Sequence, residues 1–260
     1  MIHKTAIIDT QANISKNVKI GAYSVIGPNV QIGKDTIIHS HVVISGNTTI
    51  GTDNKIYSFA SIGSDPQDLK YNNEQTSLKI GDQNIIREHV TINPGTSGGG
   101  GETIVGNSCL LMISSHIAHD CRIGNNVVIA NNVAIAGHVE IGDFVVIGGN
   151  SAVQQFTRIG KMAMIGGMTG VLKDVIPYGL SMGNRNYLQG LNLIGLRRKG
   201  ILNKDILALS KVYKEIFKTD KLTDNLKNIN VISKDNSLIN EVIRFITKDK
   251  KRPICTPFSK

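Results

Sequence analysis

Three histidines, His116, His119 and His138, lie close together in the chain, and Asp120 directly follows the second of them. An imidazole with an unperturbed pKa near ~6.5 can accept a proton at neutral pH. A carboxylate beside it can fix its tautomer and stabilise the imidazolium. Gly137 precedes His138, and a glycine lets a substrate carbonyl approach a backbone N–H closely, as an oxyanion stabiliser requires. These residues are a candidate site for proton-transfer catalysis by a histidine, if the fold brings both segments together.

The element that must position these residues is a repeat with a period of six. Counting in sixes from Ile2 reaches an isoleucine at every step to Ile62, and the register resumes at Ile80 and again from Val105 to Val171. Of these 26 positions, 22 are isoleucine and the others are Val or Leu. This period fits neither an amphipathic helix nor an alternating strand, but it fits a short strand followed by a sharp corner. Three such sides close a coil of about 18 residues, and coils stack as parallel strands ~4.8 Å apart.

Because one coil is about 18 residues long, residues 18 apart in the sequence are predicted to lie above one another in neighbouring coils. Position 119 plus 18 is 137, so His119 is predicted to lie directly beneath Gly137, one coil apart. By the same count, Asp120 lies beneath His138. Neither residue of the pair falls on an inward-pointing repeat position, which predicts that both lie at a side or corner of the coil.

The repeat predicts a mainly β protein in which residues 1–172 form a parallel β-helix of eight to nine coils. Stacked β-branched side chains fill its narrow interior, where a tryptophan would not fit, and glycine directly follows the repeat residue twelve times, where it eases a close corner. The repeat is interrupted near 64–78 and near 93–103. Both interruptions are predicted to be loops outside the coil, and long loops on a rigid scaffold are common places for binding groups.

Residues 173–260 are predicted to form a basic, mainly α-helical domain. Apolar residues recur at helical spacing after Asn203, which is predicted to cap that helix, and again from Ser237 to Thr247. Residues 1–172 carry 11 Lys plus Arg and 12 Asp plus Glu, a net charge of −1, whereas residues 173–260 carry 18 and 8, a net charge of +10. The basic clusters are Arg197, Arg198 and Lys199, and Lys248, Lys250, Lys251 and Arg252.

A basic domain attracts anionic ligands, here phosphate groups or an acidic protein. Nucleic acid is not expected, because no binding motif occurs and aromatic residues are not interleaved with the charges.

The longest apolar run, Cys109 to Ile113, is too short to cross a membrane. Three widely spaced cysteines offer neither a disulfide framework nor a metal-ligand spacing. The first residues lack the apolar core of a signal peptide, so a cytoplasmic location is expected.

Several longer runs occur in order along nearly the whole chain. They are Ser40-His41-Val42-Val43, Tyr57-Ser58-Phe59-Ala60-Ser61-Ile62-Gly63, Gln67-Asp68-Leu69-Lys70-Tyr71, His116-Ile117-Ala118-His119-Asp120-Cys121, Ala130-Asn131-Asn132, Ala136-Gly137-His138-Val139, Gly183-Asn184 and Gly195-Leu196-Arg197-Arg198-Lys199-Gly200. Together they resemble the bacterial UDP-N-acetylglucosamine O-acyltransferases of lipid A synthesis. This is far more specific than the six-residue period alone.

The resemblance implies a left-handed β-helix and a homotrimer with active sites between neighbouring prisms. It implies a (3-hydroxy)acyl donor on acyl carrier protein, UDP-N-acetylglucosamine as acceptor, and neither a cofactor nor a metal. In this reading His119 removes the proton of the sugar 3-hydroxyl, Asp120 orients His119, and the Gly137 N–H stabilises the oxyanion. Gly167 matches the position that limits acyl-chain length, and a glycine there implies a longer chain.

Further residues are assigned to substrate binding by the resemblance alone. Contacts to the sugar, the diphosphate or the pantetheine arm are assigned to Asp68, Lys70, His116, His138 and Gln155, and contacts to the nucleotide to Asn192 and Arg198.

The chain also departs from the family pattern. Asn93-Pro94-Gly95-Thr96 replaces His-Arg-Gly-Thr, Gln154 occupies a place that is often histidine, Ile194 stands where an acidic nucleotide contact is expected, and Lys199 replaces an arginine. The effect on nucleotide binding, the choice between a 3-hydroxyl and a 3-amino acceptor, and the acyl group's length and 3-hydroxylation stay open.

Two other functions compete with acyl transfer. A metal-dependent hydratase resembling the hexapeptide-repeat carbonic anhydrases would bind zinc through three histidines of adjacent subunits, but no matching ligand spacing is found. A non-catalytic scaffold would use the prism as a rigid strut and the basic domain for binding.

Overall fold

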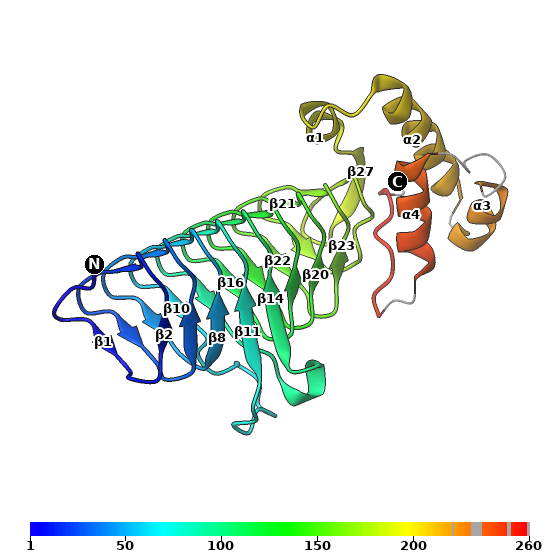
Figure 1. Cartoon of the computed structure of the whole chain (residues 1–260). Helices are drawn as coiled ribbons and strands as arrows, with labels where there is room; N and C mark the ends of the chain where they lie inside the picture. The colour runs from blue at the N-terminus through cyan, green and yellow to red at the C-terminus, as the bar shows by residue number, and fades with distance from the viewer. Residues whose placement is uncertain (220, 230–235, 249–250, 259–260) are drawn as a thin grey trace.

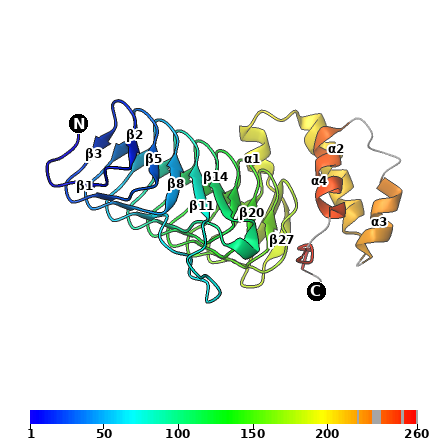
Figure 2. The same ribbon diagram turned by 60° about the horizontal axis from the view of Figure 1, so that its bottom comes forward.

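The computed structural model describes residues 1–219, 221–229, 236–248 and 251–258. A long three-sided prism extends from the N-terminus, and the helices lie at its opposite end (Figure 1, Figure 2). The prism is a parallel β-helix, which confirms the predicted mainly β fold followed by C-terminal helices.

The prism has three faces, each a sheet of short strands. The first face comprises β1 (Ile7–Ile8), β4 (Val25–Ile26), β7 (Val43–Ile44), β10 (Ser61–Ile62), β13 (Thr91–Ile92), β16 (His116–Ile117), β19 (Ala134–Ile135), β22 (Ala152–Val153) and β25 (Gly170–Val171). The second comprises β2 (Asn13–Ile14), β5 (Val30–Ile32), β8 (Asn47–Ile50), β11 (Ser77–Ile80), β14 (Glu102–Val105), β17 (Arg122–Ile123), β20 (Glu140–Ile141) and β23 (Arg158–Ile159). The third comprises β3 (Lys19–Ile20), β6 (Ile37–Ile38), β9 (Lys55–Ile56), β12 (Ile85–Ile86), β15 (Leu110–Leu111), β18 (Val128–Ile129), β21 (Val146–Ile147), β24 (Met164–Ile165), β26 (Gly179–Met182) and β27 (Tyr187–Leu191).

The six-residue repeat forms the core of the prism. Every repeat position from Ile20 to Val171 is at most 3% exposed, because one aliphatic side chain per side points inward. Ile117 pairs with Ile135, an offset of 18 residues, as the coil length predicts. The register is therefore determined by burial of the repeat residues.

The two interruptions of the repeat leave the prism at the same corner. One loop, residues 63–76, joins β10 to β11, and the other, residues 93–101, joins β13 to β14 and contains a 3₁₀ turn at Ser97–Gly99. Since β10 pairs with β13 and β11 with β14, the loops belong to neighbouring coils. Figure 1 shows them on the same side of the prism, in cyan and green.

The third sheet continues past residue 172. β26 pairs with β24 in parallel, and β27 pairs with β26 in antiparallel orientation. The helices follow: α1 (Leu193–Arg198), α2 (Asn203–Ile216), α3 (Leu222–Ile229) and α4 (Ser237–Thr247). Asn203 is the first residue of α2 and Leu202 is its N-cap, so the predicted cap was wrong. Lys250 of the predicted basic cluster lies outside the described residues.

A buried ion pair connects the prism to the C-terminal segment. The Arg158 guanidinium lies 2.8 Å from the carboxylate of Asp174, and both side chains are at least nine-tenths buried. The backbone of Asp174 in turn forms a parallel bridge with Ile254. Among the described residues, no helix is both long enough and apolar enough to cross a membrane.

Asn236 caps α4, and we expect its replacement with alanine to lower the free energy of unfolding by about 1 kcal/mol. Its side-chain oxygen accepts hydrogen bonds from the N–H groups of Leu238 and Ile239, at 3.0 and 3.3 Å. Chemical denaturation at fixed protein concentration measures the change. Asn236→Ser keeps an acceptor at the cap and should stay near the wild-type value; equal losses in both variants would contradict the capping role.

Candidate active site

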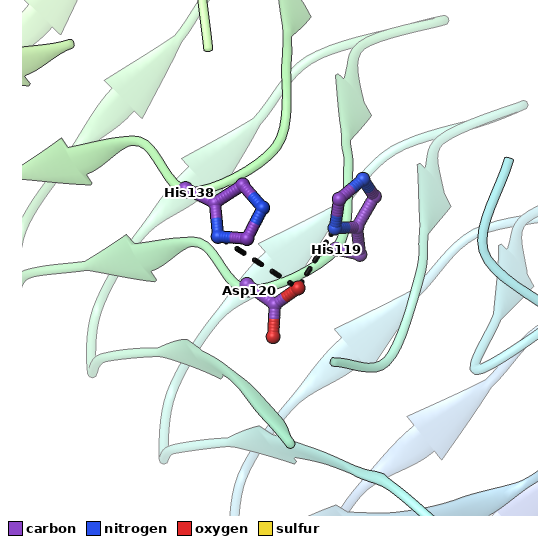
Figure 3. Close-up of side chains that lie close together, drawn as sticks. All are labelled: His119, Asp120 and His138. Carbon is purple, nitrogen blue, oxygen red and sulfur yellow. Dashed lines mark hydrogen bonds and ion pairs between the residues drawn. The ribbon is translucent and has the colours of Figure 1, made fainter. Parts of the chain in front are cut away.

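The side chains of His119 and Asp120 contact each other at the corner that follows β16 (Figure 3). His119 Nδ1 lies 2.8 Å from Asp120 Oδ2. The Asp120 side chain is fully buried, and 13% of the His119 side chain is exposed. A carboxylate beside Nδ1 places the proton on that nitrogen and leaves the lone pair on Nε2. Nε2 has no hydrogen-bond partner among the described residues and is free to act as a base.

Gly137 lies against the ring of His119, one coil further along, as the 18-residue period predicts. The His138 N–H donates to the His119 carbonyl at 3.0 Å, which fixes the register of the two corners. A Cβ on Gly137 would lie 2.6 Å from His119 Cε1 and 2.7 Å from Nε2, so any side chain here would displace the imidazole. The Gly137 N–H donates no hydrogen bond to another described residue and is available to an oxyanion.

The loop of residues 93–101 and the strand that follows it, β14, supply the other partners of Asp120. Thr96 donates from its N–H and from its hydroxyl to the carboxylate, and the Asp120 N–H donates to Thr103 Oγ1 at 2.8 Å. Gly99 lies so close that a Cβ there would be 1.9 Å from Asp120 Cγ. The repeat pattern predicted only a loop here, with no role for these residues. The available signal was its position, since it interrupts the coil that stacks directly against the one carrying His119.

The two other histidines lie beside the pair. His138 Nδ1 is 3.9 Å from Asp120 Oδ2, and the His138 and His119 rings meet edge to face with centroids 5.0 Å apart. Burial lowers the pKa of His138, and Asp120 opposes this to a smaller extent. Burial, followed by the effect of His119, lowers the pKa of His116, whose Nδ1 lies 2.7 Å from Thr91 Oγ1. Both imidazoles are therefore mostly uncharged at neutral pH and suited to hydrogen bonding.

A cavity of about 270 Å³ opens beside these side chains, with Asp120, His138, Arg122 and Lys251 in its wall. Lys251 Nζ lies 4.3 Å from the ring centroid of Phe156, which stacks on His138. The segment after α4 therefore returns to the prism next to the histidines. The wall holds three cations, Arg122, Arg158 and Lys251, and two carboxylates, Asp120 and Glu140, so positive charge is in excess and favours anionic substrates.

The remaining predicted contacts on the prism are outside the wall of this cavity. Asp68 is half-buried and Lys70 is exposed in the loop of residues 63–76, where the Lys70 N–H donates to Asp68 Oδ1 at 3.0 Å. Among the described residues, no hydrogen bond or ion pair joins Asp68 or Lys70 to the histidines, and the charge of Asp68 raises the pKa of His138 only slightly against the larger effect of burial. Gln155 is exposed, and its carbonyl accepts from Arg252 Nε at 3.0 Å.

The two predicted nucleotide contacts belong to α1. Asn192 is the N-cap of this helix: its Oδ1 accepts from the Gly195 N–H and its Nδ2 donates to the Met162 carbonyl, each at 3.0 Å. Arg198 and Ile194 are exposed on the helix. Within one chain, no hydrogen bond or ion pair between described residues connects Asn192 or Arg198 to the histidines.

Two residues that depart from the family pattern, Asn93 and Lys199, make specific contacts in this structure. Asn93 is buried, and its amide donates to the carbonyls of Ser64 and Asp65, at 2.9 and 3.1 Å, which connects the two loops. Lys199 Nζ lies 3.6 Å from the ring centroid of Phe144, which holds the end of α1 against the prism.

Gly167 is exposed at the end of the prism. A Cβ there would lie 3.3 Å from the Gly149 carbonyl oxygen, a tight contact, but the backbone of Gly167 is outside the left-handed region. The residue that takes the left-handed corner conformation is Met168, with φ of 57°. Backbone conformation therefore does not require glycine at this position.

Family models match both parts of the chain. Residues 174–255 match the model described as UDP N-acetylglucosamine O-acyltransferase, domain 2. Residues 11–46 and 102–137 match the bacterial transferase hexapeptide model, which describes six repeats.

Similar proteins cover nearly the whole chain. A Rickettsia canadensis protein named acyl-(acyl-carrier-protein)–UDP-N-acetylglucosamine O-acyltransferase is 49% identical over 255 residues, 98% of this chain and 97% of the relative. A Methylobacterium radiotolerans protein of the same name is 58% identical over 200 residues, 76% of this chain and 74% of the relative. The crystal structure of UDP-N-acetylglucosamine O-acyltransferase from Moraxella catarrhalis, 46% identical, superposes with a TM-score of 0.95 over 97% of this chain and 98% of that one. This chain therefore belongs to the UDP-N-acetylglucosamine O-acyltransferase family.

Proposed function

We propose that this protein transfers a (3-hydroxy)acyl group from acyl carrier protein to the 3-hydroxyl of UDP-N-acetylglucosamine, the first step of lipid A synthesis. The names of its relatives give both substrates. The observation in this chain that carries the proposal is the His119–Asp120 pair beside the free N–H of Gly137. We place the reaction in the cytoplasm, and it needs no cofactor because the thioester itself is a substrate.

In the proposed mechanism, His119 Nε2 removes the proton of the sugar 3-hydroxyl as that oxygen attacks the thioester carbonyl carbon. Negative charge develops on the carbonyl oxygen, to which the Gly137 N–H donates a hydrogen bond. Collapse of the tetrahedral intermediate breaks the C–S bond, and the proton on His119 passes to the departing sulfur. The products are a 3-O-acylated nucleotide sugar and a carrier protein with a free thiol. Asp120 stabilises the imidazolium between the two steps.

Substrate binding is assigned to the residues around the cavity and to α1. Asp68, Lys70, His116, His138 and Gln155 contact the sugar, the diphosphate or the pantetheine arm in this proposal. Asn192 and Arg198 contact the nucleotide in a cleft completed by a neighbouring subunit of a homotrimer. Acyl carrier protein, an acidic partner, suits the C-terminal residues with their net charge of +10.

Incubation with UDP-N-acetylglucosamine and a panel of acyl carrier protein thioesters, read by mass spectrometry, tests the proposal. We expect a nucleotide sugar heavier by one acyl group, and a carrier protein returned to its free thiol. Parallel reactions with the 3-amino sugar nucleotide determine the acceptor. Saturable binding of the carrier protein without any acylated product would instead support a non-catalytic scaffold.

A metal-dependent hydratase is the second candidate, because ligand atoms of His119, Asp120 and His138 lie within 4.8 Å of one another. Two features oppose it. The carboxylate of Asp120 already accepts three hydrogen bonds, and His119 Nδ1 donates one of them. Elemental analysis of the purified protein that finds one zinc ion per site would favour this candidate over acyl transfer.

Replacing Gly167 with methionine is expected to shift the enzyme toward shorter acyl chains. Each methylene excluded from an apolar groove costs about 0.8 kcal/mol, or roughly fourfold in binding. Blocking two or three carbons should therefore lower kcat/KM for the preferred chain by roughly 10-fold or more relative to shorter chains. Competition among thioesters of different length measures the change, with Gly27→Met, at a corner near the N-terminus, as control. An unchanged preference for acyl-chain length would mean that Gly167 does not line the acyl groove.

A further inference from the structure

The loop of residues 93–101 contains Thr96, a residue without a role in the proposed mechanism. We infer that Thr96 is a positioning residue, which acts on His119 through Asp120. The inference rests on the proposed function, since its effect on rate is measured in acyl transfer.

The hydroxyl of Thr96 orients the carboxylate that His119 uses. Thr96 Oγ1 donates to Asp120 Oδ2 at 2.6 Å, and His119 Nδ1 donates to the same oxygen at 2.8 Å. The Thr96 N–H donates to the other oxygen, Oδ1, at 2.9 Å. Rotation about the terminal bond of an aspartate side chain is soft, so hydrogen bonds decide where its oxygens lie. With both oxygens held by one residue, Oδ2 stays directed at Nδ1.

Thr96 is itself held by its own loop. It is 4% exposed, and its carbonyl accepts hydrogen bonds from the N–H groups of Gly99 and Gly101, at 3.0 and 2.8 Å. Gly101 has a left-handed φ of 79°, which favours glycine. Gly99 places bare backbone against the Asp120 carboxylate, where no side chain fits. The loop therefore encloses the carboxylate and excludes water from it, which strengthens each hydrogen bond to it.

The neighbouring loop supports the same arrangement from outside. The Glu74 carboxylate accepts hydrogen bonds from the N–H and the hydroxyl of Ser97, both at 3.2 Å. Backbone hydrogen bonds, chiefly from Asn72, lower the pKa of Glu74 to about 2, so it is ionised throughout the pH range of an activity assay. The loop that carries Asp68 and Lys70 is thereby connected, through Ser97 and Thr96, to the base.

Thr96→Val, which removes the hydroxyl at nearly constant shape, tests the inference. We expect kcat to fall roughly 10- to 100-fold, because a poorly oriented base loses part of its contribution. The KM values for both substrates should change by less than about threefold, since Thr96 is buried and its hydroxyl is bonded to Asp120. Thr96→Ser restores a hydroxyl and should recover most of the activity. Thr36→Val is the matched control: Thr36 is equally buried and hydrogen-bonded, but lies in an N-terminal coil.

A double-mutant cycle separates positioning from a general structural role. In an Asp120→Ala background, adding Thr96→Val should cost less than about twofold, because the carboxylate through which it acts is already gone. Adding Thr36→Val should have the same small effect in both backgrounds. The inference is wrong if Thr96→Val costs the same factor with and without Asp120, or if Thr96→Ser is as impaired as Thr96→Val.

A spectroscopic measurement is independent of turnover. In protein labelled with ¹⁵N-histidine, the Nδ1–H resonance of His119, assigned by its loss in His119→Ala, reports the hydrogen bond to Asp120. Thr96→Val should move this resonance and Thr36→Val should not. A wild-type protein that transfers no acyl group would refute the proposed function alone, whereas an unmoved resonance in Thr96→Val would refute the positioning role.

Discussion

His119→Ala is expected to lower kcat roughly 10²- to 10⁴-fold, which is the usual contribution of a general base. Nε2 of this residue is the one basic atom in the proposed mechanism that removes the sugar proton, and no neighbour replaces it. His138 is the other imidazole nearby, but its Nδ1 is 3.9 Å from Asp120 Oδ2, beyond hydrogen-bond distance, so Asp120 does not orient it in the same way. Mass-spectrometric rates for wild type and variant measure the effect.

The fold should survive this change. His119 lies at a corner outside the repeat positions, and Asp120 keeps both hydrogen bonds from Thr96. Circular dichroism and thermal unfolding should therefore match the wild type, and nucleotide-sugar binding measured by calorimetry should persist. His3→Ala, which removes an exposed histidine near the N-terminus, is the control. A His119 variant that keeps most of its activity would eliminate the general-base mechanism.

Gly137→Ala is expected to reduce kcat roughly 10²- to 10³-fold, the range seen when an oxyanion donor is lost. Its methyl group would lie 2.6 Å from His119 Cε1, so the ring must move and the N–H becomes less accessible. A misplacement of the base by about 1 Å can cost a further 10²-fold. The loss should appear in kcat with both KM values nearly unchanged, because the interaction is made mainly in the transition state.

Gly27→Ala provides the matched control for this variant. A Cβ on Gly27 meets its nearest neighbours at 3.4 and 3.5 Å, which are ordinary contacts, so activity and stability should be retained. A crystal structure of Gly137→Ala should show a displaced imidazole. Full activity with the ring in its original place would mean that Gly137 neither supports His119 nor donates to the oxyanion.

The prism was predictable because an aliphatic side chain is buried at every repeat position. From Ile20 to Val171 each repeat residue is buried, so a slip of one residue would expose aliphatic side chains on every coil. The register that places Gly137 over His119 follows from this burial. The N-cap of α2 was not predictable in the same way. Capping preference is a local bias of about 1 kcal/mol, and Leu202 occupies that position instead of Asn203.

The site was predictable where it lies on the prism and unpredictable where it lies on the loops. The stacking of Gly137 on His119 could be predicted from the 18-residue length of one coil alone. The partners of Asp120 in the loop of residues 93–101 lie some 24 residues away, in a segment without periodicity. Neither the two hydrogen bonds from Thr96 nor the contact with Gly99 has a repeating pattern that a sequence would display.

The sequence by itself determined the prism, its register and the placement of Gly137 over His119, because an aliphatic residue must be buried at each repeat position of every coil. Asp120 is next to His119 in the sequence itself. Only the tertiary structure decided which oxygen of Asp120 faces the imidazole, how the loops enclose it, and where α1 and the segment after α4 lie relative to the cavity. These features depend on single long-range contacts, each made once, and their energies depend on burial that exists only after the chain has folded.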